Sequence, residues 1–219
     1  MSVVLYIHGM GGGRDSRIPS ILNELFHASA ADVEVIVKTY DFDPEVAAGQ
    51  INKWIEELRP SVVVGESLGA LHAMRVKGIP LLFVSPAINA PLYFELLAWL
   101  SLIPGVTWLF DRIYKPREGE RQKLHFTFRV LRKYHRHRKS AFESIENHAG
   151  GICHAFFGSN DHYRRSGVVS IHSWRKHVGN SFSVYNGTHF MEEEHVIDKL
   201  APAILEVLNE RNELKSTLS

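Results

Sequence analysis

The sequence has 219 residues, enough for one domain with a core that needs neither disulfides nor metals. With 45% apolar residues, 22% charged residues and a formal net charge of +1, the composition argues against a nucleic-acid-binding protein and against a disordered chain. Cys153 is the single cysteine, so no internal disulfide is expected. Because the chain also opens on a strand-like run rather than a cleavable leader, a cytoplasmic location is favoured.

Short apolar runs alternate with helical patterns along the chain. Most of the runs lack polar alternation, as buried parallel strands do, and they predict strands at 3–7, 33–37, 62–64, 81–84, 152–157 and 181–185. Helices are predicted at 18–30, 44–58, 68–77, 168–178 and 192–212, with Asp43 as a cap and Pro44 in the first turn of the second. The pattern predicts a single α/β domain, residues 1–219, with a mainly parallel sheet of about six strands flanked by helices.

Residues 89–149 interrupt this alternation with a segment too long for a plain loop. Residues 92–110 are apolar but contain Glu95, Pro104 and Gly105, which predicts two short helices joined by a bend rather than a membrane span. Residues 115–139 are basic, which is most often an exposed helix face, although residues 121–139 could also contact anionic lipid. We expect residues 89–149 to form a helical lid over one edge of the sheet.

The chemistry centres on Ser67 in Gly65-Glu66-Ser67-Leu68-Gly69, which follows an apolar strand and precedes a helical pattern. A tight strand-to-helix turn of this kind lifts a serine hydroxyl above a sheet, and it needs glycines where side chains would collide. We therefore predict that Ser67 is a nucleophile.

A serine hydroxyl needs a base, and the base needs a group that orients it. Asp161 follows the strand predicted at 152–157, and His189 follows the strand at 181–185. Both positions are at the carboxyl ends of parallel strands, where reacting groups collect. The order Ser67, Asp161, His189 predicts a catalytic triad.

Two backbone amides must also hold the oxyanion of a tetrahedral intermediate. We assign one to Leu68 and the other to Met10, in the glycine-rich run after the first strand. The alternatives for this run are a flexible turn or a phosphate loop, but the latter lacks the Gly-Lys-Ser/Thr ending.

Four further residues are expected to line the site: His8, Gly9, Gly11 and Glu66, although His8 could instead be structural and Glu66 a solvent-facing residue. The thirteen histidines include no metal-binding pair of the His-Glu-x-x-His type, so no metal is expected. His135 and His137 are predicted to add solvated charge, and Cys153 to be an inert thiol within a strand.

Together, Leu5-Tyr6-Ile7-His8-Gly9, the elbow around Ser67, Gly158-Ser159-Asn160-Asp161 and Gly187-Thr188-His189-Phe190 resemble the α/β-hydrolase superfamily over nearly the whole chain except the insertion. The short N-terminus resembles small bacterial YqiA-like esterases, although the insertion here is longer. The resemblance implies hydrolysis of a small carboxylic ester or thioester without a cofactor. The alternative is a protein with this fold that binds a ligand or partner with little or no catalysis.

Overall fold

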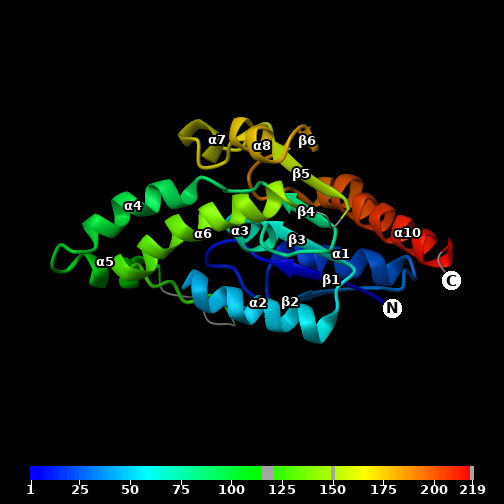
Figure 1. Cartoon of the computed structure of the whole chain (residues 1–219), viewed down its shortest axis with the longest axis horizontal. Helices are drawn as coiled ribbons and strands as arrows, with labels where there is room; N and C mark the ends of the chain where they lie inside the picture. The colour runs from blue at the N-terminus through cyan, green and yellow to red at the C-terminus, as the bar shows by residue number, and fades with distance from the viewer. Residues whose placement is uncertain (115–120, 149–150, 218–219) are drawn as a thin grey trace.

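The computed structural model describes residues 1–114, 121–148 and 151–217, and its centre is one parallel sheet (Figure 1). All five pairings between neighbouring strands are parallel, and the order is β2-β1-β3-β4-β5-β6. The strands are β1 (Ser2–Ile7), β2 (Val33–Val37), β3 (Val62–Glu66), β4 (Leu81–Val84), β5 (Cys153–Gly158) and β6 (Phe182–Tyr185). The predicted α/β fold with about six strands is confirmed.

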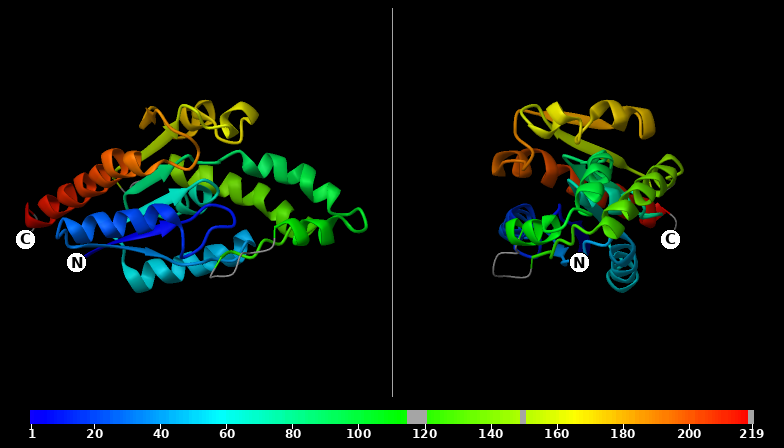
Figure 2. Two further views of the ribbon diagram at one scale, coloured as in Figure 1. Left: turned by 180° about the vertical axis from the view of Figure 1, so that it is seen from behind. Right: turned by 90° about the vertical axis from the view of Figure 1, so that its left-hand side faces the viewer.

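Helices cover both faces of the sheet, as expected for strands in which apolar residues do not alternate with polar ones. One face packs against α1 (Arg17–Ala28), the π-helical η1 (Val196–Leu200) and α10 (Ala201–Thr217), which lie in front in the left-hand view of Figure 2. The other packs against α2 (Pro44–Leu58), α3 (Gly69–Ala73), α6 (Phe128–Glu146) and α8 (Ile171–His177). The two layers of helices leave the carboxyl ends of the strands free to carry a site.

The strand order reverses at β1, since the chain runs outward to β2 and then crosses back to β3. Ile7 in β1 pairs with Gly65 in β3, so the loops that follow these two strands begin side by side. In open α/β sheets such a switch point forms a crevice where ligands bind.

Two predicted helices differ from the structure more than the others. The helix expected at 68–77 ends at Ala73, because the chain must turn back within a few residues to enter β4 at Leu81. The helix expected at 192–212 is divided into α9 (Glu193–His195), η1 and α10. The α2 helix does begin as predicted, since the Asp43 side chain accepts a hydrogen bond from the amide of Glu45 at 3.0 Å.

The insertion has two parts with different surroundings. Its first part is the predicted pair of short helices, α4 (Ala90–Leu100) and α5 (Val106–Ile113), which form a hairpin at the far end of the molecule from both termini (Figure 1). Its second part, α6, contributes Leu131, Tyr134 and Phe142 to the core on the face of the sheet. The expected position over one edge is therefore wrong for α6, which is the crossover helix between β4 and β5. Residues 115–120 and 149 of the expected lid lie outside the described residues.

The basic run is only partly the exposed face that its composition predicts. His137 is buried, contrary to prediction, because it lies on the inner side of α6, where its Nδ1 is 2.9 Å from Arg75. Arg138 donates hydrogen bonds to the carbonyl of Ile88 and the side chain of Asn89, so part of this charge holds the start of α4 in place. No helix in the described part of the chain is long and apolar enough to cross a bilayer.

Candidate functional site

Ser67 occupies a strained turn between β3 and α3. Its φ angle is 49°, a left-handed conformation that a non-glycine residue rarely adopts and that is often found at functional sites. A Cβ atom at Gly69 would lie 2.3 Å from the carbonyl oxygen of Ile7, and one at Gly65 would lie 2.7 Å from the Cβ of Ala73. Both glycines are therefore required by the close approach of neighbouring backbone and helix.

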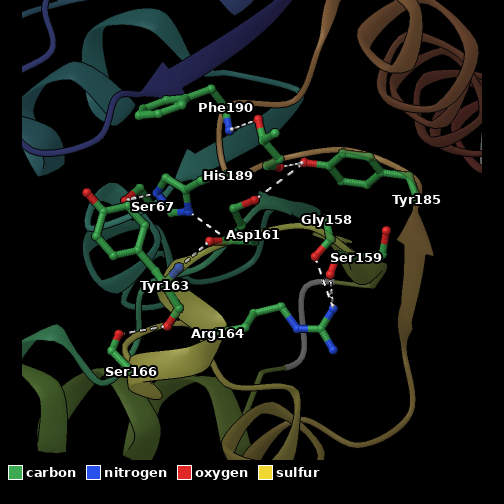
Figure 3. Close-up of polar contacts among 12 residues, drawn as sticks. Ser67, Gly158, Ser159, Asp161, Tyr163, Arg164, Ser166, Tyr185, His189 and Phe190 are labelled. Carbon is green, nitrogen blue, oxygen red and sulfur yellow. Dashed lines mark hydrogen bonds and ion pairs between the residues drawn. The ribbon is translucent and has the colours of Figure 1, made fainter.

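The structure brings Ser67, His189 and Asp161 into one hydrogen-bonded chain (Figure 3). His189 Nε2 lies 2.9 Å from Ser67 Oγ, and His189 Nδ1 lies 2.8 Å from Asp161 Oδ2. His189 and Asp161 are both buried, whereas Ser67 is partly exposed at the floor of a cavity. A proton on Nδ1 of His189 leaves Nε2 free to accept from the serine hydroxyl.

Backbone contacts fix the two loops that carry the acid and the histidine. The other oxygen of Asp161, Oδ1, accepts from the amide of Tyr163 at 2.8 Å. The amide of Thr188 donates to the Glu192 carboxylate, which secures the residue before His189. A Cβ atom at Gly158 would lie 2.3 Å from the carbonyl oxygen of Thr188, so only glycine lets the two loops come together here.

The glycine-rich loop after β1 lies against Ser67. A Cβ atom at Gly9 would lie 3.1 Å from the Cβ of Ser67. Within the described parts of the chain, the amides of Met10 and Leu68 donate to no protein acceptor, and both residues line the cavity. The amides of Gly11 and Gly12 are already engaged, by Gln122 and Gly9 respectively.

Gln122 is a residue of this site that the sequence analysis missed. Its side-chain oxygen accepts from the backbone amide of Gly11 at 3.0 Å, and its backbone amide donates to the carbonyl of Gly12 at 2.7 Å. The preceding residue, Arg121, forms an ion pair with Asp15 at 2.8 Å. The insertion thus clamps the loop of Met10. The position of Gln122 within a basic, strandless segment carried no signal of this contact.

His8 does not line the cavity, which was one of the two roles expected of it. It is completely buried, and its ring stacks on Tyr40 with 4.4 Å between ring centroids. Its Nδ1 lies 2.7 Å from the carbonyl oxygen of Gly9, and burial lowers the pKa of its imidazole to about 4. His8 is therefore neutral at pH 7 and supports the loop from behind.

Glu66 lines the cavity beside Ser67, and it is not a solvent-facing residue. Tyr6 donates a hydrogen bond to its Oε2 at 3.0 Å. Burial raises the pKa of the Glu66 carboxyl, although the Tyr6 hydrogen bond and the nearby His189 act in the opposite direction. The Glu66 carboxyl thus lies close enough to His189 for the charges of the two groups to interact.

A cavity of about 460 Å³ opens over Ser67 and His189. Its walls come from the loop after β1, the elbow, the start of α4 and the segments that carry Tyr163 and Phe190. From the expected lid, Ala90, Tyr93, Phe94 and Arg121 contribute directly. This volume suits a small, mostly apolar ligand.

The remaining candidate groups give no second site. Among the described residues there is no group of three or more His, Cys, Asp or Glu side chains placed to hold a metal ion. Cys153 is partly buried in β5, and burial raises the pKa of its thiol to about 12. A thiol that is so difficult to ionise is a poor nucleophile.

The sequence matches no protein-family model and has no significant match among curated proteins. Solved structures do match. Est1E from Butyrivibrio proteoclasticus, crystallised with ferulic acid, has a TM-score of 0.63 at 16% identity, over 95% of this chain and 90% of that one. A carboxylesterase from the thaumarchaeon Nitrososphaera gargenis has a TM-score of 0.56 at 12% identity, over 95% and 92%. The chain has the α/β-hydrolase fold.

This fold does not by itself determine the reaction. The bottromycin epimerase BotH also matches, with a TM-score of 0.51 at 12% identity, over 94% of this chain and 90% of that one. The α/β-hydrolase fold is therefore found in proteins that are named for different chemistry. The activity of this chain must be argued from the residues of its own site.

Proposed function

We propose that this chain is a serine hydrolase that cleaves a carboxylic ester or thioester through an acyl-enzyme intermediate. The observation that supports the proposal most directly is the hydrogen-bonded chain from Ser67 through His189 to Asp161. Each residue in it has the chemistry its position requires: a hydroxyl exposed to the cavity, an imidazole beside it, and a buried carboxylate behind.

In the proposed reaction, His189 Nε2 removes the proton from Ser67 Oγ as this oxygen attacks the substrate carbonyl. Asp161 holds the proton on Nδ1 and stabilises the imidazolium that forms. His189 then protonates the leaving alcohol or thiol, and the acyl group remains on Ser67. A water molecule that loses its proton to His189 attacks this ester, releases the acid and restores the serine.

The backbone amides of Met10 and Leu68 are the proposed oxyanion hole. Their lack of protein acceptors supports this role, since both donors are free to bind the oxygen of the tetrahedral intermediate. We assign the acyl pocket to the apolar part of the cavity near Phe94 and Val168, so that the start of the insertion shapes the substrate site. The α4–α5 hairpin would then be the lid, with Tyr93 and Phe94 at its base.

The proposal is tested with a fluorophosphonate probe and with p-nitrophenyl acyl esters of increasing chain length. The wild-type protein should be labelled at Ser67 and should turn the esters over, whereas Ser67→Ala should do neither. Ser159→Ala is the matched control, because Ser159 is exposed on the loop after β5, and it should label and react normally. Labelling elsewhere, or full activity of Ser67→Ala, would refute the mechanism. A folded wild-type protein without labelling would favour a binding role.

The clamp by Gln122 gives a second prediction. Gln122→Ala removes the acceptor for the Gly11 amide, so the neighbouring Met10 amide should be less well positioned for the oxyanion. We expect kcat to fall about tenfold with a smaller change in KM, less than the loss when an oxyanion donor is deleted outright. Lys123→Ala, at an exposed neighbour, should leave kcat unchanged. A positioning role would be contradicted if both variants lost the same fraction of kcat. It would also be contradicted if Gln122→Ala were partly unfolded at the assay temperature to an extent that explains its lower kcat.

A further inference from the structure

The α4–α5 hairpin, residues 90–113, exposes an unusual amount of apolar surface. Eight large apolar side chains of the described chain are more than half exposed, and six of them belong to this hairpin: Leu96, Trp99, Leu102, Ile103, Trp108 and Ile113. Monomeric proteins rarely leave so large an apolar patch in contact with water. The hairpin is therefore a candidate contact surface.

The outer side of α4 is apolar, as its inner side is. A helix at a protein surface usually keeps one polar side. On α4, Phe94 and Ala98 are buried, yet Leu96 and Trp99 on its outer side are also apolar. None of the eight residues of α5 is buried. An exposed apolar side of this kind is suited to the boundary between lipid headgroups and acyl chains.

The charge of the same region is complementary to an anionic surface. Residues 90–114 and 121–139 contain nine of the 25 Lys and Arg residues but only two of the 24 Asp and Glu residues, a formal charge of +7 in a chain whose total is +1. The remainder of the chain is consequently acidic. An anionic membrane would attract this end of the molecule and repel the other.

A shallow pocket of about 510 Å³ joins the apolar and basic surfaces, where Trp99 and Phe128 lie beside four cationic side chains. Lys133 is neutralised there by Asp43 and Glu45, and Arg132 by Glu95. Arg129 forms no ion pair with any other described residue, and Arg136 only a long one, 3.9 Å from Glu45. Two exposed arginines next to a tryptophan are suited to an anionic headgroup at the level of the interface.

The hairpin also leads to the candidate active site. The α4 helix begins at the cavity, where Ala90, Tyr93 and Phe94 form part of the wall, and ends at the exposed tip. Figure 1 shows this tip extending away from the sheet, opposite both termini. The exposed tip is therefore joined to the cavity wall by a single helix of about 16 Å.

We propose that the α4–α5 hairpin inserts into the surface of a membrane that contains anionic lipid. The apolar side chains of the tip enter the boundary of the acyl chains, and the arginines of α6 contact the headgroups. The hairpin does not span the bilayer. The contact does not depend on catalysis by Ser67, so the two proposals can fail separately.

The test is flotation of the full-length Ser67→Ala protein with vesicles of phosphatidylcholine, with and without phosphatidylglycerol. We expect binding to the anionic vesicles, reduced at least tenfold in Ile103→Ser/Trp108→Ser, since two large apolar side chains no longer leave water. Arg129→Gln/Arg136→Gln should weaken binding about thirtyfold, at about 1 kcal/mol for each of the two basic residues. Emission from Trp99 and Trp108 should be quenched by brominated lipid.

Val46→Ser/Val184→Thr is the matched control, because it removes comparably exposed apolar groups from α2 and β6, away from the hairpin. This variant should bind vesicles as the parent does. Absence of flotation, or equal binding to neutral and anionic vesicles, would overturn the proposal. Self-association that Ile103→Ser/Trp108→Ser abolishes, without lipid binding, would make the hairpin an interface between two copies instead.

Discussion

Replacing Asp161 by asparagine should lower kcat about 10,000-fold while KM and Tm stay nearly unchanged. The reason lies in how the carboxylate is held. Oδ1 accepts from the backbone amide of Tyr163, so the side-chain NH2 of an asparagine must occupy the position of Oδ2, facing His189 Nδ1. An NH2 group donates hydrogen bonds and cannot accept one from Nδ1. It would place the histidine proton on Nε2, where the ring can no longer take the proton of Ser67.

The measurement is steady-state turnover of the best p-nitrophenyl ester, with thermal unfolding of the same samples. Asn160→Ala is the control, because Asn160 is the exposed residue before Asp161 and its side chain contacts only Asn186. We expect this control to keep kcat within about twofold, as usual for a surface change away from the reacting groups. A loss of less than tenfold in Asp161→Asn would mean that the carboxylate does not orient the histidine during the reaction.

The second large effect is a loss of stability in mild acid. His8, His72 and His137 are buried, and burial lowers the pKa of each imidazole, to about 4 for His8 and about 3 for His137. His72 and His137 lie together, with 4.5 Å between ring centroids, and Arg75 further disfavours a charge on either ring. The folded protein thus holds all three neutral through most of the acidic range.

The direction in which stability changes with pH follows from proton uptake by the unfolded chain. Below the ordinary histidine pKa of about 6.5, the unfolded chain binds protons that the folded protein does not. Stability is therefore fully present above about pH 6.5 and falls as the pH drops toward the folded-state values. The loss approaches about 1.4 kcal/mol per pH unit for each histidine, or about 4 kcal/mol per unit for the three. Glu66 acts in the opposite direction, since its raised pKa favours the folded state as the pH falls, but it is a single group.

Denaturant unfolding at several values between pH 5 and 8 measures this slope. Both ring nitrogens of His72 lack a partner in the described structure, so His72→Leu should fold and should reduce the slope by up to about 1.4 kcal/mol per pH unit. His27→Gln, at an exposed position on α1, should leave the slope unchanged. An identical slope in the wild-type protein and His72→Leu would show that this histidine is not held neutral by the fold.

Much of the site could be predicted because its signals are local. The elbow around Ser67 combines a strand, two glycines and a helix start within a few residues, and Asp161 and His189 each follow directly after a strand. Parallel strands bring such loops to the same edge of the sheet, so chain order and position predicted their proximity. The strands were found nearly to the residue because buried parallel strands are continuous apolar runs.

Residues 89–149 were harder to interpret, since a helical pattern shows that a helix exists but not what lies against it. The basic character of α6 hid the fact that its inner side belongs to the core, and that His137 is buried there. The role of Gln122 was hidden for the same reason, because its partners are more than a hundred residues away in the sequence.

The sequence by itself determined the fold class, the strand-to-helix turn and the order of the three polar residues, because each of these follows from short-range pattern and from the geometry of parallel sheets. The tertiary structure alone decided that the three residues form one hydrogen-bonded chain, that the amides of Met10 and Leu68 have no acceptor among the described residues, and that His8 supports the site from behind. Hydrogen bonds and burial depend on which distant segments meet, and that information appears only once the chain is folded.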